Sequence, residues 1–480
     1  MANGRRPKPL AAWRALLAAA FMAAAGLPQT LSDATARERA APTTRESIQL
    51  SFAPIVKTAA PAVVNVYVSA RPAANAPLAN DPFFRHFFRQ EPNRAPRAQN
   101  SLGSGVIVSA DGLIVTNNHV IQGGDAANVT VALADNREFE AKVILRDPRT
   151  DLAVLRIQDA DGDFPHLRFG DSDALEVGDL VLAIGNPFGV GQTVTSGIVS
   201  ALARTRIGVT DYQFFIQTDA AINPGNSGGA LVDMNGDLIG VNTAIFTRSG
   251  GSQGVGFAIP SNMVKLIADS AMSGARVRRP WLGAKLEPVT PDIARALGLE
   301  RAAGALVGSV APTGPAERAG LRPGDVLLQV DGREVTDPQT FYYYFTTKGL
   351  EGSVKVEALQ PVGRRRQLAI ALTPPPETTP RDERTLSGPH PFSGARIANL
   401  SPAVAEELSA DAFEGVAVIE TEAYSTARRV GLQPGDIIVS VNGKTVGAVA
   451  EVQRAVTQPA RVWRLVIRRG GREIRTVVRS

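Results

Sequence analysis

The chain of 480 residues contains no cysteine, which excludes disulfides, thiol nucleophiles and zinc sites built on thiolates. Its four histidines lie far apart without the spacing of metal ligands, so we expect no metal and no other cofactor. Aromatic residues make up only 6%, whereas glycine (45) and proline (33) are abundant. This balance favours short strands and turns over long helices, and we expect a mainly β protein.

The N-terminal segment lacks an apolar run long enough to span a membrane as a helix. Its run from about Ala15 to Leu27 is shorter than the roughly 20 residues that a spanning helix needs. A basic head precedes the run, and Ala34-Thr35-Ala36 follows it, which is the pattern of a cleavable secretory signal. We expect residues 1–36 to be a signal peptide, with an uncleaved membrane anchor as the alternative.

The formal net charge of +5 includes four basic residues of this segment. Near the C-terminus, Arg464, Arg468 and Arg475 alternate with apolar residues. Such alternation is typical of the solvated face of a strand, and it does not indicate a nucleic-acid partner.

Residues 37–275 are predicted to form one β-rich domain. Val63–Val68 is rich in β-branched residues, and Gly105–Val108 and Leu113–Thr116 flank a turn that ends in Gly112. Short strands joined by Gly and Asp turns favour a barrel or sandwich over βαβ units. After this region, Ser261 is expected to cap a helix that ends at Gly274.

Residues 71–100 interrupt the strand pattern with proline, asparagine and arginine around four phenylalanines. Irregular segments of this length are usually functional or disordered. We expect a regulatory or assembly contact here; a hydrophobic plug packed on its own barrel is the alternative.

An internal repeat follows this domain. Ala316–Val335 aligns with Ala427–Val446 at an offset of 111 residues, with ten of twenty positions identical. Trp281–Ala284 and Phe392–Ala395 begin similar segments at the same offset. The sequence therefore predicts a duplicated domain, at residues 280–373 and 390–480, with the proline-rich residues 374–389 as an extended linker.

A glycine-rich segment, Asn223 to Leu231, contains a candidate nucleophile, Ser227. A serine hydroxyl attacks well only when a base removes its proton and backbone donors face the developing oxyanion. Glycines let successive N–H groups point into one cavity, so the N–H groups of Gly225 and Ser227 are candidate donors, with that of Asn226 as a third. A structural glycine-rich turn is the alternative for this motif alone.

Two further motifs supply a base and an acid. His119 follows a predicted strand, and Asp151 begins another. The order His, Asp, Ser differs from the order Ser, acid, His of α/β-hydrolases, whose elbow motif also fits around Ser227. The β-rich context and the chain order therefore indicate a triad of His119, Asp151 and Ser227.

These segments resemble chymotrypsin-fold serine proteases, and more specifically the HtrA (DegP/DegQ-type) family. The resemblance rests on TNNHVI, DPRTDLAVL, AIGNPFG, TDAAINPGNSGGALV and GFAIP, and it covers nearly all of the chain after the signal. It implies a double β-barrel protease followed by two PDZ domains, located in the periplasm, that degrades misfolded or unfolded envelope proteins without ATP. It also implies assembly as homotrimers that can form cages. A chaperone or peptide-sensing scaffold in which proteolysis is secondary is the competing class.

The resemblance also assigns binding residues. The S1 pocket would be lined by side chains that offer no acid for Lys or Arg: Ala221, Ile222, Asn242, Thr243, Ala244 and Ile245. Cleavage after Val, Ile or Ala is therefore expected. The loops 71–100, 186–191, 204–213 and 243–254 would order or block the active site. Two loops would hold the C-terminal carboxylate of a peptide through backbone N–H groups: Trp281, Leu282, Gly283 and Ala284, and Phe392, Ser393, Gly394 and Ala395.

Overall fold

The computed structural model describes Met1 and residues 51–70, 99–121, 129–158, 162–186, 191–205, 214–245, 252–274, 277–361, 363–408, 410, 414–458 and 460–479. The chain divides into Met1–Phe52 and Ala53–Ser480, and the elements below belong to the second unit. The expected signal peptide beyond Met1, most of the expected loop 71–100 and the interiors of the other three predicted loops lie outside the described residues.

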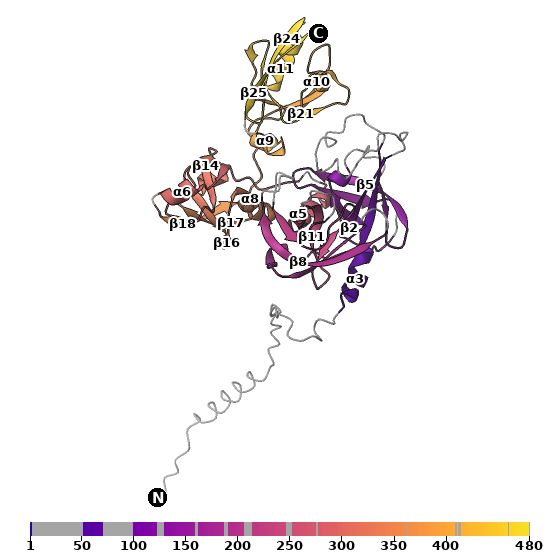
Figure 1. The fold of residues 1–480 in the computed structure, drawn as a ribbon. Coiled ribbons are helices and arrows are strands. Elements are labelled where there is room, and N and C mark those ends of the chain that lie inside the picture. The colour runs from indigo at the N-terminus through magenta and orange to yellow at the C-terminus, as the bar shows by residue number, and fades with distance from the viewer. Residues whose placement is uncertain are drawn as a thin grey trace. The chain divides into compact units, whose positions relative to one another are not determined.

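The first barrel is closed, with the strand order β1-β2-β3-β6-β5-β4. Two of its strands, β2 and β5, can be found in Figure 1. It comprises α3 (Ala53–Ala59), η1 (Ala60–Ala62), β1 (Val63–Ala70), β2 (Gln99–Ile107), β3 (Leu113–Asn117), η3 (His119–Ile121), β4 (Val129–Ala132), β5 (Glu138–Asp147) and β6 (Leu152–Ile157). The predicted hairpin is confirmed, because Val106 pairs with Val115 across β2 and β3. Alternate valines of β1 fill the barrel, as the period of two along a strand requires.

The second barrel is also closed, with the strand order β10-β11-β12-β9-β8-β7. It comprises η4 (Ser172–Ala174), β7 (Leu180–Gly185), β8 (Thr193–Arg204), β9 (Phe215–Thr218), β10 (Ala230–Val232), β11 (Leu238–Ile245) and β12 (Gly256–Pro260). Apolar side chains from all six strands form the interior, among them Val181, Val199, Ile216, Leu231, Ile239 and Ala258. Two barrels and short turns confirm the mainly β prediction.

The predicted helix after the second barrel is α5 (Ser261–Met272). Its apolar face is buried at Met263, Val264, Ile267 and Ala271, as expected. The predicted serine cap is wrong: Pro260 is the N-cap residue, and the hydroxyl of Ser172 accepts from the N–H of Asn262 in the first turn, at 3.1 Å. The hydroxyl of Ser261 instead donates to the carbonyl of Gly170, at 2.6 Å. The carbonyl of Gly170, distant in the sequence, therefore engages the hydroxyl that the capping pattern had assigned to the start of the helix.

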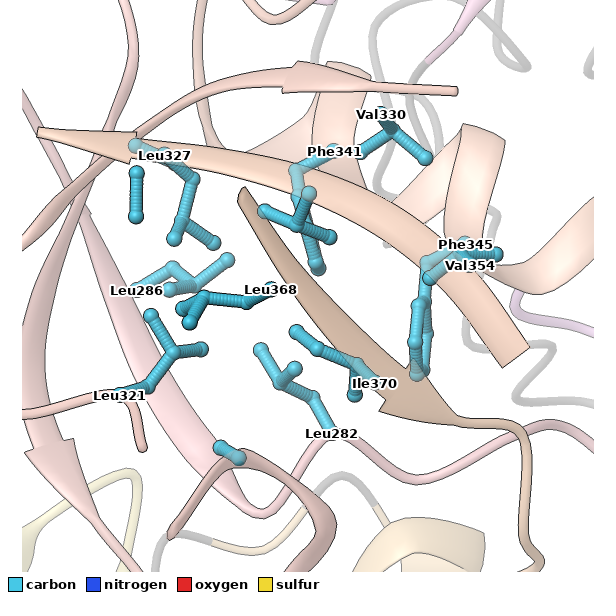
Figure 2. Packing of buried hydrophobic residues seen from close by; sticks show 14 of the residues in the cluster. Leu282, Leu286, Leu321, Leu327, Val330, Phe341, Phe345, Val354, Leu368 and Ile370 are labelled. Carbon is cyan, nitrogen blue, oxygen red and sulfur yellow. The ribbon is translucent and has the colours of Figure 1, made fainter. Parts of the chain in front are cut away.

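The third unit of structure is a sheet with the order β13-β14-β15-β17-β18. Its elements are β13 (Ala284–Pro288), α6 (Pro291–Ala296), β14 (Ala305–Val310), α7 (Pro315–Arg318), β15 (Val326–Val330), β16 (Arg333–Glu334), α8 (Pro338–Thr347), β17 (Ser353–Leu359) and β18 (Arg365–Ala371). Figure 2 shows its core, in which Leu282 from the loop before β13 lies among Leu286, Leu368 and Ile370. The first candidate carboxylate loop is thus anchored in the core by its leucine.

The last sheet has the order β19-β20-β21-β22-β24-β25. Its elements are β19 (Arg384–Thr385), β20 (Ala395–Asn399), α9 (Pro402–Leu408), β21 (Val416–Thr421), α10 (Thr426–Arg429), β22 (Ile437–Val441), β23 (Lys444–Thr445), α11 (Val449–Val456), β24 (Val462–Arg469) and β25 (Arg472–Arg479). Strands β13 to β16 recur as β20 to β23 at the offset of 111 residues seen in the repeat. The helices follow the same offset, because α6, α7 and α8 begin 111 residues before α9, α10 and α11. Even the irregularity after Lys285 in β13 recurs after Arg396 in β20. The predicted duplication is confirmed.

Candidate active site

The histidine and the aspartate meet at the edge of the first barrel. His119 begins the turn η3, directly after β3, whose five residues are all buried. Its Nδ1 lies 2.7 Å from Oδ2 of Asp151, and its main-chain N–H donates to Oδ1 of the same carboxylate at 3.0 Å. Both side chains are about nine-tenths buried. The two contacts fix the imidazole against the carboxylate, with Nδ1 toward the acid.

Asp151 itself has a left-handed backbone, with φ of +57°. Non-glycine residues adopt this conformation at a cost, so the surroundings must hold it. Its carbonyl accepts from the N–H of Asn118 at 2.9 Å and from Nδ2 of Asn117 at 3.1 Å. On the other side, buried Asp147 accepts from the hydroxyl of Thr150 and pairs with Arg279. Hydrogen bonds and an ion pair on both sides of Asp151 therefore hold its left-handed backbone in place.

Thr243, from β11, connects Asp151 to Ser227. Its hydroxyl donates to Oδ2 of Asp151 at 2.9 Å, while its carbonyl accepts from the hydroxyl of Ser227 at 3.2 Å. A chain of hydrogen bonds thus runs from His119 through Asp151 and Thr243 to Ser227. The sequence placed Thr243 in the substrate pocket, and the structure gives its side chain this different contact.

The candidate nucleophile, Ser227, follows a tight turn at residues 223–226. Asn226 N–H donates to the carbonyl of Asn223 at 2.9 Å, and Gly225 has φ of +98°. Proline at the second position and a positive φ at the third are typical of a type II turn. Because this turn engages the N–H of Asn226, that group does not face a ligand. Within the described part of the chain, the N–H groups of Gly225 and Ser227 have no acceptor.

Ser104, buried in β2, braces this turn at several points. Its N–H donates to the carbonyl of Ser227 at 2.9 Å, and its hydroxyl donates to the carbonyl of Gly225 at 2.7 Å. The same hydroxyl accepts from the N–H of Asn186 at 2.9 Å. Sequence reasoning missed Ser104, because a serine within a strand carries no local signal of a partner 121 residues away.

Gly228 provides a test of how closely this site is packed. Its φ is +85°, and a Cβ added there would lie 2.0 Å from the carbonyl oxygen of Ser104. Gly228→Ala should therefore displace the backbone beside Ser227 and lower kcat/KM by at least about 100-fold, because such displacements misalign reacting groups. The measurement is steady-state hydrolysis of an unfolded protein.

Gly236 is the matched control for this substitution. It has φ of +81° in the same barrel, yet its added Cβ would meet only an ordinary contact at 3.8 Å. Gly236→Ala carries the same conformational strain, about 1–2 kcal/mol, and should keep the parent's activity. Equal activity of the two variants would show that the contact with Ser104 is unimportant for the site.

The expected S1 residues differ in their surroundings. Ile222 is buried in the core of the second barrel, and Asn242 Nδ2 donates to the carbonyl of Ala230 at 2.9 Å. The carbonyl of Ala221 accepts from the hydroxyl of Thr195 at 2.9 Å. Ala244 and Ile245 lie at the end of β11, and their side chains are outside the described part. The pocket remains a prediction.

The two candidate carboxylate loops have the same backbone. Gly283 and Gly394 have φ of +70° and +80°. Their carbonyls accept from the N–H groups of Ala311 and Glu422, at 2.7 and 2.8 Å. Both loops therefore turn their glycine carbonyls into the domain, which suits loops whose N–H groups serve a ligand.

Two further properties of the described residues bear on function. No group of three acidic or histidine side chains there could hold a metal ion. None of the helices described is long and apolar enough to cross a membrane.

Comparisons with known proteins agree on the two kinds of domain. The family model of the trypsin-like peptidase domain matches residues 103–241, and that of the PDZ domain matches residues 306–348 and 421–469. The periplasmic serine endoprotease DegP of Salmonella typhimurium is 36% identical, over 94% of this chain and 96% of its own length. A probable periplasmic serine endoprotease, DegP-like, of Marinomonas sp. is 40% identical, over 83% of this chain and 87% of its own.

A solved structure described as the HtrA-type protease AlgW with tripeptide is 43% identical. It matches with a TM-score of 0.51 and covers 68% of this chain and 98% of its own.

Proposed function

Because the chain belongs to the HtrA family of periplasmic serine endoproteases, we propose that His119, Asp151 and Ser227 are its catalytic triad. The observation that carries this assignment is the chain of hydrogen bonds that joins the three residues through Thr243. Three side chains from motifs far apart in the sequence are thus linked by hydrogen bonds, which supports the roles that acyl transfer assigns to them.

His119 takes the proton of the Ser227 hydroxyl as that oxygen attacks the scissile carbonyl, and later gives it to the leaving amine. Asp151 holds Nδ1 of the imidazole as a donor and stabilises the imidazolium. The N–H groups of Gly225 and Ser227 stabilise the oxyanion, with Asn226 serving the turn instead. Water then hydrolyses the acyl-enzyme through the same groups.

The substrates are unfolded or misfolded envelope proteins. The segment before the nucleophile offers Ala221 and Ile222 to the S1 pocket, without an acid that could hold Lys or Arg. Residues such as Val, Ile and Ala are buried in folded proteins, so an apolar pocket for them selects unfolded chains. Accompanying chaperone activity would use the same preference for exposed apolar segments.

The two PDZ domains bind C-terminal peptides through their carboxylate loops and thereby regulate the protease. Support comes from the shared left-handed glycines Gly283 and Gly394 and from the inward carbonyls of both loops. The active assembly is a homotrimer that can enlarge to cages, as the family implies.

Hydrolysis of unfolded casein by protein lacking residues 1–36 tests the pocket. We expect most cuts to follow Val, Ile or Ala, since a missing or added methylene in an apolar pocket changes rates by roughly 10–200-fold. Mass spectrometry of the fragments identifies the residue on the amino side of each cut. A majority of cuts after Lys, Arg or aromatic residues would contradict the apolar pocket while leaving the triad untouched.

A further inference from the structure

The strand before the second PDZ domain occupies an edge that its counterpart leaves open. Strand β19 pairs antiparallel with β20, with Arg384 opposite Ile397 and Thr385 opposite Arg396. In the first PDZ domain, the equivalent strand β13 pairs with β14 and with no other described strand. A peptide ligand adds as a strand to such an edge. In the second domain, the chain itself already fills that place.

The next residue, Leu386, bonds directly to the carboxylate loop. Its N–H donates to the carbonyl of Ala395 at 2.9 Å, and its own carbonyl accepts from the N–H of Gly394 at 2.8 Å. Gly394 is one of the donors proposed to hold a peptide carboxylate. The carbonyl oxygen of Leu386 therefore stands where an oxygen of a terminal carboxylate would lie.

The side chains of this segment contact the helix that flanks β20. Leu386 is 4% exposed and belongs to one apolar cluster with Phe392, Val449 and Val452. Two residues earlier, Arg384 Nη1 donates to Oε1 of Gln453 at 2.7 Å. Val449, Val452 and Gln453 all lie on α11. Residues 384–386 therefore contact β20 on one side and α11 on the other.

A short hairpin joins this segment to β20. Within it, His390 packs its ring against Phe392 and Trp463, with centroids 6.5 and 6.4 Å apart. Burial lowers the pKa of His390, which favours the neutral ring. The N–H of His390 donates to the carbonyl of Gly388 at 3.0 Å. The hairpin thus packs on the core of the second PDZ domain and holds residues 384–386 between β20 and α11.

We propose that the groove of the second PDZ domain, between β20 and α11, is a binding site whose resident occupant is the chain's own segment Arg384–Leu386. This rests on the proposed peptide-binding function. The groove accepts a segment that ends in an apolar residue such as Leu, with a polar side chain two positions earlier within reach of Gln453. An external C-terminal peptide of this class binds only by displacing the resident segment.

Tethering makes the resident segment a strong competitor. A ligand joined to its site by a short linker acts at an effective concentration in the millimolar range. An external peptide therefore binds with an affinity reduced by the fraction of grooves that are open. The two PDZ domains then differ in how readily they take up a peptide, since the first has no such strand among its described residues.

The test uses the full chain with Ser227→Ala, so that bound peptide is not cut. The probe is a synthetic peptide that ends in Arg-Thr-Leu with a free carboxylate and carries a photo-crosslinker; mass spectrometry assigns each crosslink to one PDZ domain. Leu386→Ala should raise crosslinking to the second domain at least about tenfold by emptying the apolar pocket. Leu400→Ala, which removes another buried leucine of the same domain, should not raise it.

An engineered disulfide distinguishes displacement of the resident segment from unfolding of the second PDZ domain. The chain has no cysteine, so Thr385→Cys with Arg396→Cys introduces a unique pair. These residues lie opposite each other, at a distance that a disulfide can bridge. The pair should oxidise readily. In the Leu386→Ala protein, oxidation should abolish crosslinking to the second domain, and reduction should restore it.

Any of four outcomes would overturn the inference. One is equal crosslinking of the second domain in the parent and in Leu386→Ala. Another is a cysteine pair that stays reduced under mild oxidant. The third is crosslinking of the first domain without the second in Leu386→Ala, which leaves the proposed function standing. Crosslinking of neither domain would overturn the peptide-binding proposal as well.

Discussion

Ser227→Ala should abolish proteolysis, with kcat on unfolded casein reduced by roughly 10⁶-fold. The substitution removes the attacking oxygen and its bond to the carbonyl of Thr243. It leaves the turn before the nucleophile intact, because that turn is closed by the backbone of Asn223 and Asn226. The variant should therefore fold like the parent and still bind substrate. The measurement is the rate of casein cleavage by protein lacking residues 1–36.

Ser261→Ala is the matched control, since its hydroxyl is also buried and bonds to a carbonyl, that of Gly170. This control should keep the parent's rate. A fluorophosphonate that acylates active-site serines should label the parent and the control but not Ser227→Ala. If Ser227→Ala cut casein within about tenfold of the parent, another residue would be the nucleophile.

The sequence singled out three candidate catalytic residues because each lies in a local motif with a meaning of its own. His119 and Asp151 flank predicted strands, and Ser227 lies among glycines, so their order along the chain could be compared with known arrangements. The repeat was equally accessible: identities at one constant offset imply equal elements, and β20 to β23 follow from β13 to β16.

What the sequence did not predict depends on contacts between distant residues. Thr243 reaches Asp151 across 92 positions, and no local pattern distinguishes such a threonine from one that lines a pocket. Ser261 was assigned to a helix cap by a rule that ignores the carbonyl of Gly170. Strand β19 has two residues in a proline-rich segment, which is too short for alternation to be visible. These two residues form a strand only because they pair with β20, and the sequence does not show that pairing.

The second large effect is expected at the acid. Asp151→Asn should lower kcat by about 10⁴-fold at neutral pH, because an amide that donates toward Nδ1 of His119 forces the proton onto the other ring nitrogen. That tautomer cannot accept a proton from Ser227. The fold should persist, since asparagine tolerates the left-handed backbone found at Asp151 and is nearly isosteric with it. Steady-state kinetics on a peptide substrate measure the loss.

Asp233→Asn is the control for a carboxylate that only closes a turn. Asp233 accepts from the N–H groups of Asn235 and Asp237, away from the triad, and its substitution should leave kcat unchanged. For Asp151→Asn, KM should stay within about threefold of the parent, because the acid acts on the transition state and not on bound substrate. Fluorophosphonate labelling should slow by a factor like that of kcat, since acylation needs the same base. A raised KM with an unchanged kcat would instead make Asp151 a residue of the substrate site, and the link through Thr243 would then serve only to hold β11 beside the first barrel.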